Sequence, residues 1–271
     1  MLTAASLFGE IRDDDQSYRL FCSIAMQGES QGGWENGRIA RLVPDRVLAP
    51  KVARHGADED KHGRIFRSLL RKRGLEPVQV PPETDYTMLL ERQGIGLAHE
   101  RLGRDQPLTE HDVLVYLVHS RVTEQRAAEQ MRLLRKIFGD DPELGRAVRM
   151  ICADENNHLA YCHEELLRLS AQGHRDEIES LLRTTALAEI RVYRAVSLAV
   201  MKHMGRILEW PRWKQMVLAL GSHAVYCYER LGGYRRMIVL KAPPPALRNA
   251  MGRERPSEHH RGAATPTSAS T

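Results

Sequence analysis

The sequence lacks several features that would assign it directly to a common functional class. Its four cysteines form no CxxC pair, which excludes a rubredoxin-type iron knuckle and a zinc ribbon. All four lie in apolar stretches of helical pattern, so we expect buried, reduced thiols. Aromatic residues make up only 6% of the 271 residues, and alternating valine-rich runs are scarce, which argues against a β-sandwich or a β-barrel.

Long apolar runs and an export signal are also missing. No apolar run approaches the ~18 residues of a membrane span, so we expect no membrane partner. The N-terminus MLTAASLFGEIRDDD has no basic segment and soon meets three aspartates, unlike a secretory signal. These absences predict a cytoplasmic protein. The net charge of +5 is modest and spread along the chain, so a nucleic-acid partner is not expected.

Helical periodicity dominates the sequence and predicts an all-α fold. Pro44 and Asp45 break the first long pattern, and Gly74 ends the second after the basic turn RKR. Thr109 is a candidate N-cap for the third. A PVQVPPETD stretch and a short amphipathic piece around Tyr86 to Glu100 separate the second pattern from the third. The expected long helices cover roughly residues 17–42, 46–73, 109–138, 142–169, 175–206 and 211–231.

The order of these helices predicts two long helical hairpins joined by a connection over residues 75–108. This is the layout of a four-helix bundle with one long crossover, here extended by two additional C-terminal helices. We expect residues 1–241 to form a single helical domain, with the core bundle at about 17–169 and the extra helices at about 175–231. The PPP and RERPSEHHRGAATPTSAST segments that follow predict a disordered tail over 242–271.

Two short motifs point to metal chemistry. DEDKH at 58–62 and DENNH at 154–158 both read DExxH, and a shuffled chain of this composition would contain only about 0.05 such matches. Residues three apart share one face of a helix, so the Glu and His of each motif can converge on one ion. Carboxylate and imidazole donors suit iron, manganese or zinc better than magnesium or calcium. The repeat therefore predicts a metal centre, with two solvated acidic faces as the alternative.

Each hairpin also carries a glutamate level with its motif. In an antiparallel pair of helices, residues that lie level are symmetric about the turn. Glu29 and Glu59 average to position 44, the proline between the first two helices. Glu124 and Glu155 average to 139.5, inside the GDDP turn. Glu35 is the rival in the first helix, but its average with Glu59 is 47, off the turn, so we prefer Glu29.

Together these residues look like the E…ExxH…E…ExxH set of ferritin-like di-iron carboxylate proteins. The fuller DExxH form resembles acyl-carrier-protein desaturases and the hydroxylase subunits of bacterial multicomponent monooxygenases. The resemblance covers roughly residues 17–169, although Lys61 and Asn157 stand where those enzymes usually have arginine. The metal ligands that it implies are Glu29, Glu59, His62, Glu124, Glu155 and His158.

The resemblance also implies a role for each residue. Glu59 and Glu155 would bridge two iron ions, or one manganese and one iron, and the other four ligands would be terminal. Asp58 and Asp154 would each accept a hydrogen bond from the histidine of the opposite motif, which fixes the tautomer and angle of that imidazole. Dioxygen would be a reactant, and the reductant would be an external electron donor because the chain has no rubredoxin-type segment.

Four further residues are candidates for a pocket beside the metals. His55 stands one turn before Glu59, where it either lines the pocket or is a satisfied structural histidine. Glu189 and Tyr193 fall on the apolar stripe of a later helix. A carboxylate there needs an arginine from another helix, a metal ion or a role in the pocket. His223, in the last long helix, is a similar candidate.

The function that these expectations favour is oxidation of a small organic substrate by a di-iron oxygenase or oxidase, through hydroxylation, desaturation or N-oxygenation. The extra helices and the 75–108 connection exceed what an iron store needs and offer material for a pocket wall or a lid. A rubrerythrin-like ferroxidase or peroxidase is the alternative. A tRNA-modifying di-iron hydroxylase is supported only by the excess of arginine, and a non-catalytic helical scaffold also stays open. The protein could act as a homodimer.

Overall fold

The computed structural model describes residues 2–240, which belong to one compact unit. Every regular element in this range is helical, which confirms the all-α class, and none of these helices is long and apolar enough to cross a membrane. The predicted tail over 242–271 lies outside the described residues. The α-helices are α1 (Ala4–Asp13), α2 (Asp15–Leu42), α3 (Leu48–Lys72), α4 (Tyr86–Glu91), α5 (His99–Gly103), α6 (Glu110–Phe138), α7 (Gly145–Leu169), α8 (Arg175–Ile207), α9 (Arg212–Tyr228) and α10 (Arg235–Ile238). The short 3₁₀ and π segments are η1 (Pro82–Thr84), η2 (Ser170–His174) and η3 (Glu229–Gly233).

Local sequence signals explain where the long helices begin and end. Asp14 caps α2, because its carboxylate accepts a hydrogen bond of 2.8 Å from the backbone N–H of Ser17. Thr109 caps α6 as predicted, in a reciprocal capping box with Asp112. Gly74 follows α3 with a φ of +69°, a conformation that glycine adopts without strain.

Both hairpin turns are built around an aspartate, and this shifts the start of the second helix in each. The Asp45 carboxylate accepts hydrogen bonds from two backbone N–H groups, so α3 begins at Leu48 and not at 46. Asp141 does the same in the second turn, so α7 begins at Gly145 and not at 142. Helix α1 was not predicted, because its pattern is short and merges with the run of aspartates that follows.

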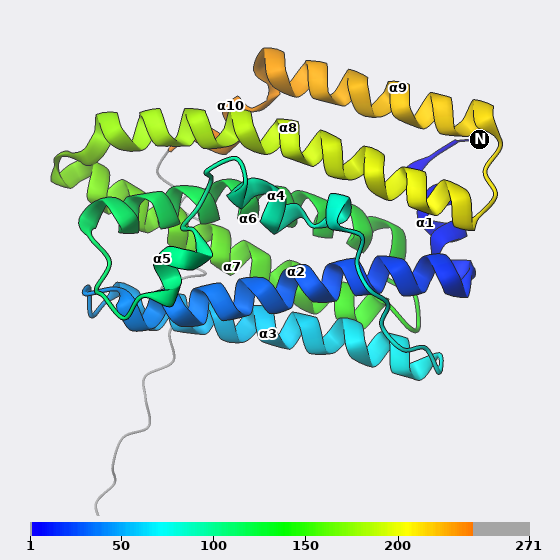
Figure 1. Cartoon of the computed structure of the whole chain (residues 1–271), viewed down its shortest axis with the longest axis horizontal. Coiled ribbons are helices and arrows are strands. Elements are labelled where there is room, and N and C mark those ends of the chain that lie inside the picture. Colours follow the sequence, from blue (N-terminus) through cyan, green and yellow to red (C-terminus); the bar gives the residue numbers. More distant parts are fainter. Residues whose placement is uncertain (1, 241–271) are drawn as a thin grey trace, which may run out of the picture. The chain divides into compact units, whose positions relative to one another are not determined.

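The helices form a bundle of two hairpins (Figure 1). Helix α2 packs along α3, and α6 packs along α7. The two hairpins meet where α3 contacts α7. Helix α8 lies against α6 and carries α9 on its other side, while η1 and α4 of the long connection pack against α8, and α4 and α5 against α2. Acidic and histidine residues in the middle of α2, α3, α6 and α7 therefore come from different helices to one interior.

Two apolar clusters occupy the two ends of these hairpins. One cluster, with Leu48, Val52, Leu117 and Leu166, lies toward the α2–α3 turn. The other cluster lies toward the opposite end of α2 and α3 and comprises Tyr18, Cys22, Phe66, Leu69, Leu70, Leu134, Leu144, Ala147, Val148 and Ile151. On each of the four helices, the predicted metal ligands fall between the segments that supply these clusters. The polar centre is thus enclosed by packed apolar side chains.

The cysteines agree with expectation at three positions of four. Cys22, Cys152 and Cys162 are free and buried. Burial raises the pKa of the Cys22 thiol to about 12, which keeps it protonated and unreactive. Cys227 is free but exposed, so the prediction that it is buried was wrong. The reason is that α9 packs against α8 through one face and turns the rest of its surface, including Cys227, outward.

Candidate metal centre

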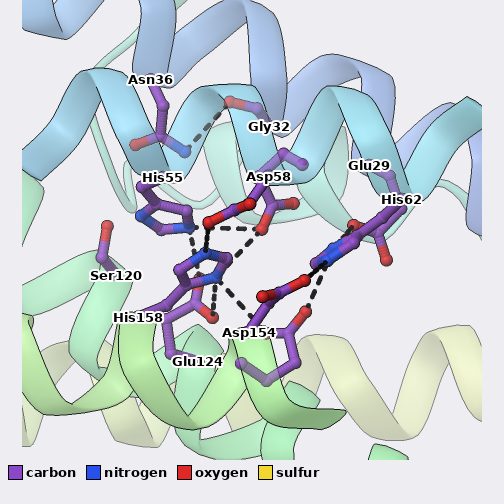
Figure 2. Close-up of polar contacts among 12 residues, drawn as sticks. Glu29, Gly32, Asn36, His55, Asp58, His62, Ser120, Glu124, Asp154 and His158 are labelled. Carbon is purple, nitrogen blue, oxygen red and sulfur yellow. Dashed lines mark hydrogen bonds and ion pairs between the residues drawn. The ribbon is translucent and has the colours of Figure 1, made fainter. Parts of the chain in front are cut away.

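Four helices bring the six predicted ligands and His55 together in the middle of the bundle (Figure 2). Their ligand atoms form two groups, and within each group the atoms lie within 4.8 Å of one another. The first group is Glu29, Glu59, His62 and Glu155. The second group is His55, Glu59, Glu124 and His158. Glu59 belongs to both, so each group could hold one metal ion and the two ions would share a carboxylate.

His62 points one nitrogen into the first group and anchors the other. Its Nδ1 atom lies 3.1 Å from Glu29 Oε2 and 3.5 Å from Glu155 Oε1. Its Nε2 atom lies 3.0 Å from Asp154 Oδ2, on the opposite hairpin. With Nε2–H donating to the aspartate, the lone pair on Nδ1 faces the two carboxylates. This is the arrangement of a ligating imidazole, whose second N–H is held by a carboxylate.

His158 repeats this arrangement in the second group with longer contacts. Its Nδ1 atom lies 3.4 Å from Glu59 Oε1 and 3.6 Å from Glu124 Oε2. Its Nε2 atom faces Asp58, 3.5 Å from Oδ2. The two DExxH motifs are therefore related by an approximate two-fold exchange, in which each aspartate faces the histidine of the other motif.

Lys61 links the two aspartates behind the histidines. Its Nζ atom donates to Asp58 Oδ1 and lies 2.8 Å from Asp154 Oδ2. Its positive charge is balanced by these two carboxylates, one of which binds His62 while the other faces His158. Neither motif indicates this role for Lys61, because the pattern within one motif cannot show a contact to the other.

His55 lies inside the second group and not beside it. Its Nε2 atom is 3.2 Å from Glu124 Oε1 and 3.3 Å from Glu59 Oε1, and its ring stacks on that of His158 with centroids 3.9 Å apart. The side chain is only 2% exposed. The four-residue spacing from His55 to Glu59, one helical turn, was the available signal for this placement.

Several buried polar atoms of the second group have no hydrogen-bond partner. They are His55 Nε2, Glu124 Oε2 and both ring nitrogens of His158. Leaving such an atom unsatisfied costs about 1–3 kcal/mol, so a cluster of them at one point calls for a missing partner. A cation fits among three of them, because Glu124 Oε2, His55 Nε2 and His158 Nδ1 can each present a lone pair, while His158 Nε2–H faces Asp58. Mixed imidazole and carboxylate donors suit iron, manganese or zinc.

Electrostatics also favour a cation. Burial raises the pKa of both Glu29 and Glu59 to about 7, and it raises the pKa of Glu155 well above the ordinary value. Burial opposes ionisation of Glu124 as well, but His55 and His158 hold its pKa well below the ordinary value. The three raised pKa values express the cost of ionising crowded carboxylates in a water-poor interior, a cost that a bound cation would offset.

Glu35, the rival of Glu29, lies outside both groups. Its Oε1 atom is 3.0 Å from His99 Nε2, on α5 of the long connection, and it also accepts a hydrogen bond from Gln31. Glu29 thus lies in the first group and Glu35 in neither, as symmetry about the turn predicts.

Glu189 and Tyr193, two of the predicted pocket residues, belong to a separate ion-pair network. The Glu189 carboxylate accepts two hydrogen bonds of 2.8 Å from Arg126 on α6 and one of 2.9 Å from the hydroxyl of Tyr86. Tyr193 lies under the same guanidinium, with its ring centroid 3.9 Å from the Arg126 Cζ atom. For Glu189 the open alternative of an arginine from another helix is the one observed, and neither residue belongs to either ligand group.

His223 was also predicted at the pocket, and this was wrong. It lies exposed on α9, where its ring stacks on Tyr226 with centroids 6.2 Å apart.

No family model matches this chain, and no curated protein is significantly similar to it. The metal centre is therefore inferred from the placement and chemistry of the residues alone.

Proposed function

We propose that this chain is a ferritin-like non-haem di-iron oxidoreductase that uses dioxygen to oxidise a small organic substrate. The observation that carries the proposal is the sharing of Glu59 by two groups of four ligand residues. A shared carboxylate suits a pair of neighbouring ions, as in other two-metal sites. Two hairpins joined by one long connection, with Glu and ExxH sets facing inward, are also the arrangement of di-iron carboxylate bundles.

The chain's own residues would hold and shield this centre. The chemistry that two ferrous ions held there would supply is the electrons for the reduction of dioxygen, and an external donor would return the oxidised ions to the ferrous state. Asp154 and Lys61 keep His62 in one orientation, so its Nδ1 lone pair stays directed at the carboxylates of the first group. His62 and His158 are 0% and 2% exposed, so the apolar clusters around them exclude bulk water from the donors.

Several elements of the chain supply no metal ligand, and their presence favours an organic substrate over iron storage. Helix α8 covers α6, and the connection with η1, α4 and α5 lies against α2 and α8. Residues 75–108 also reach toward α2 through side-chain contacts such as that of Gln27 with Asp85, at 2.6 Å. Under this proposal, these elements would supply the wall of a substrate pocket beside the metal-bearing helices.

Iron content tests the metal part of the proposal. Full-length protein loaded anaerobically with ferrous ion should retain about two irons per chain after desalting, and the Glu59→Ala variant should retain far less. His203→Ala, which removes an imidazole that contacts Glu83 outside both groups, is the control and should retain the wild-type amount. A wild-type protein that holds no iron would refute the proposal.

Oxygen consumption tests the reaction. Ferrous protein with a chemical reductant should consume dioxygen faster when a compound of one chemical class is added, and that compound should be recovered in oxidised form. Dioxygen consumption driven by ferrous ion alone, unaffected by every organic compound, would instead identify a ferroxidase. Consumption of hydrogen peroxide together with the reductant, without dioxygen uptake, would identify a peroxidase. Loss of the consumption in Glu59→Ala would tie it to this centre.

A further inference from the structure

A chain of buried hydrogen bonds leads from His55 across the bundle. His55 Nδ1 lies 2.8 Å from the Tyr161 hydroxyl, which lies 2.7 Å from the Tyr116 hydroxyl. Tyr116 donates to Asn36 Oδ1 at 2.7 Å, and Asn36 Nδ2 donates to the backbone carbonyl of Gly32 at 3.0 Å. Tyr116 and Asn36 are 3% and 7% exposed, so solvent does not compete for these bonds. Figure 2 shows the far end of this chain, at Asn36 and Gly32.

The donor and the acceptor of each hydrogen bond in this series follow from its last member, the Gly32 carbonyl. The Gly32 carbonyl can only accept, so the Asn36 amide group must face it with Nδ2, and Oδ1 must be the acceptor for Tyr116. The hydroxyl proton of Tyr116 is used in that bond, so the Tyr116 oxygen accepts a hydrogen bond from the Tyr161 hydroxyl. The Tyr161 proton is committed in turn, and its oxygen accepts from His55 Nδ1–H.

This direction leaves the lone pair of neutral His55 on Nε2. That atom is buried, has no hydrogen bond and lies 3.2 and 3.3 Å from oxygens of Glu124 and Glu59. A lone pair aimed at carboxylate oxygens is repelled unless a cation lies between them. His62 and His158, by contrast, face their groups through Nδ1.

We propose that His55 is a third imidazole ligand, bound through Nε2 to the ion of the second group, and that Tyr161, Tyr116 and Asn36 are positioning residues that fix its tautomer. The inference rests on the proposed function and deepens it. The two ions would then be chemically distinct. The ion of the second group would have two imidazole ligands, from His55 and His158, and two carboxylate ligands, from Glu59 and Glu124. The other ion has one imidazole and three carboxylates.

Anaerobic titration of the full-length protein with Co²⁺, followed by its visible absorption, tests this inference. Wild type should bind two Co²⁺ per chain. His55→Ala should lose one binding step, or weaken it by about tenfold or more, and keep the other; added imidazole should restore the lost step. Tyr161→Phe should weaken the same step by about 10- to 100-fold. Tyr18→Phe is the control, because this buried tyrosine donates to Glu143 in the distant apolar cluster and should change neither step.

The outcomes separate this inference from the proposed function. Two unchanged binding steps and an unchanged spectrum in His55→Ala would overturn the inference and leave the metal centre intact. No binding by wild type would overturn both. If His55→Ala does not fold, the zinc-loaded wild type decides, because long-range ¹H–¹⁵N spectra report which nitrogen of His55 carries the proton. A proton on Nδ1 with a metal-shifted Nε2 is expected, and the reverse would overturn the inference.

A second feature, independent of the metal centre, is an apolar stripe on α9. The side chains recur at spacings of three and four, so they share one face of the helix. From Gln215 to Tyr228 the helix has no charged residue. The large members of the stripe are between 45% and 84% exposed and comprise Trp213, Met216, Val217, Leu220 and Tyr228 on α9, with Leu231 continuing it in η3.

The size of this stripe matches a protein interface. Together the six side chains expose on the order of 700 Å², close to the ~800 Å² per partner of a standard interface. Monomeric proteins rarely leave a contiguous apolar patch of that size in water. The part of this chain that follows residue 240 offers only Leu247 and Met251 as large apolar residues, too few to cover the stripe.

We infer that a second copy of this chain covers the stripe, with the two α9 helices antiparallel about a two-fold axis near residue 222. This register sets Leu220 against Ala224 of the second copy and Met216 against Tyr228, a favourable sulfur–aromatic pair. The absence of charge from Gln215 to Tyr228 removes the repulsion that two copies of a basic chain would otherwise meet at their contact.

Sedimentation equilibrium of the full-length protein at micromolar concentrations tests this inference. Wild type should be a dimer. Leu220→Glu should be a monomer with unchanged helical circular dichroism. Val47→Glu is the control, since it places the same charge on a side chain 65% exposed at the α2–α3 turn, and it should stay dimeric. A monomeric wild type, or a dimer that survives Leu220→Glu, would overturn the inference.

Discussion

His62 of α3 and Asp154 of α7 are joined by a hydrogen bond, with Nε2 3.0 Å from Oδ2, so an acid of one hairpin orients a metal-facing imidazole of the other. Asp58 and His158 face each other in the reverse sense at 3.5 Å. The two DExxH motifs therefore complete each other, and neither hairpin alone holds an oriented histidine.

This relationship predicts the effect of Asp154→Asn. A neutral amide still accepts from His62 Nε2–H but no longer raises the basicity of the ring or pairs with Lys61, so we expect metal affinity of the first group to fall by about 10- to 100-fold. Titration with Zn²⁺ against a competing chelator measures the change. Asp140→Asn, in the α6–α7 turn away from every ligand, is the control. Equal affinities in the two variants would contradict the prediction.

The sharing of Glu59 predicts different stoichiometries for two similar substitutions. Glu59→Gln removes a charged oxygen from both groups, so both binding steps should weaken. Glu29→Gln touches only the first group and should weaken one step, leaving about one tightly bound ion per chain. Metal analysis after desalting measures both. A Glu59→Gln variant that loses only one ion would show that the carboxylate is not shared.

Much of this centre could be predicted from the sequence because helical periodicity and turn position together fix which residues lie level. Glu29 and Glu124 carry no motif of their own, yet symmetry about the two turns placed them beside Glu59 and Glu155. The same reasoning preferred Glu29 over Glu35, which pairs with His99. Spacing along one helix and across one turn was sufficient for these residues.

The residues that were misplaced depend on contacts between elements far apart in the sequence. Glu189 pairs with Arg126 on another helix, 63 residues away, and no local pattern indicates that partner. His223 lies exposed because α9 packs through only one face, which its own apolar pattern does not show. His55 was recognised as a candidate, but its orientation depends on Tyr116, from a third helix.

The Arg126–Glu189 pair predicts a large loss of stability when only one partner is removed. Glu189 is 0% exposed and accepts two hydrogen bonds from the guanidinium, so Arg126→Met should cost about 3–5 kcal/mol by leaving a buried charge unpaired. Adding Glu189→Leu should recover part of that loss, since an apolar pair needs no partner, while Glu229 keeps only its bond from Arg236. Urea unfolding measures both variants. Arg132→Met, exposed on the same helix, should change stability little, and a double variant less stable than Arg126→Met would contradict the prediction.

Glu229 predicts how stability depends on pH. Burial opposes its charge, but hydrogen bonds from Arg126 and Arg236 hold its pKa below the ordinary value. Because the folded pKa is lowered, the stabilisation is complete above the unfolded pKa of about 4.3 and is lost as the pH falls through the lower folded pKa. The melting temperature of Glu229→Gln should therefore lie well below that of wild type at pH 7, and the difference should shrink as the pH falls below about 4. Glu179→Gln, at an exposed position on α8, should show little difference at either pH. A difference for Glu229→Gln that stays constant from pH 7 to pH 3, roughly the range of carboxylate titration, would mean that the two arginines do not hold the charged form.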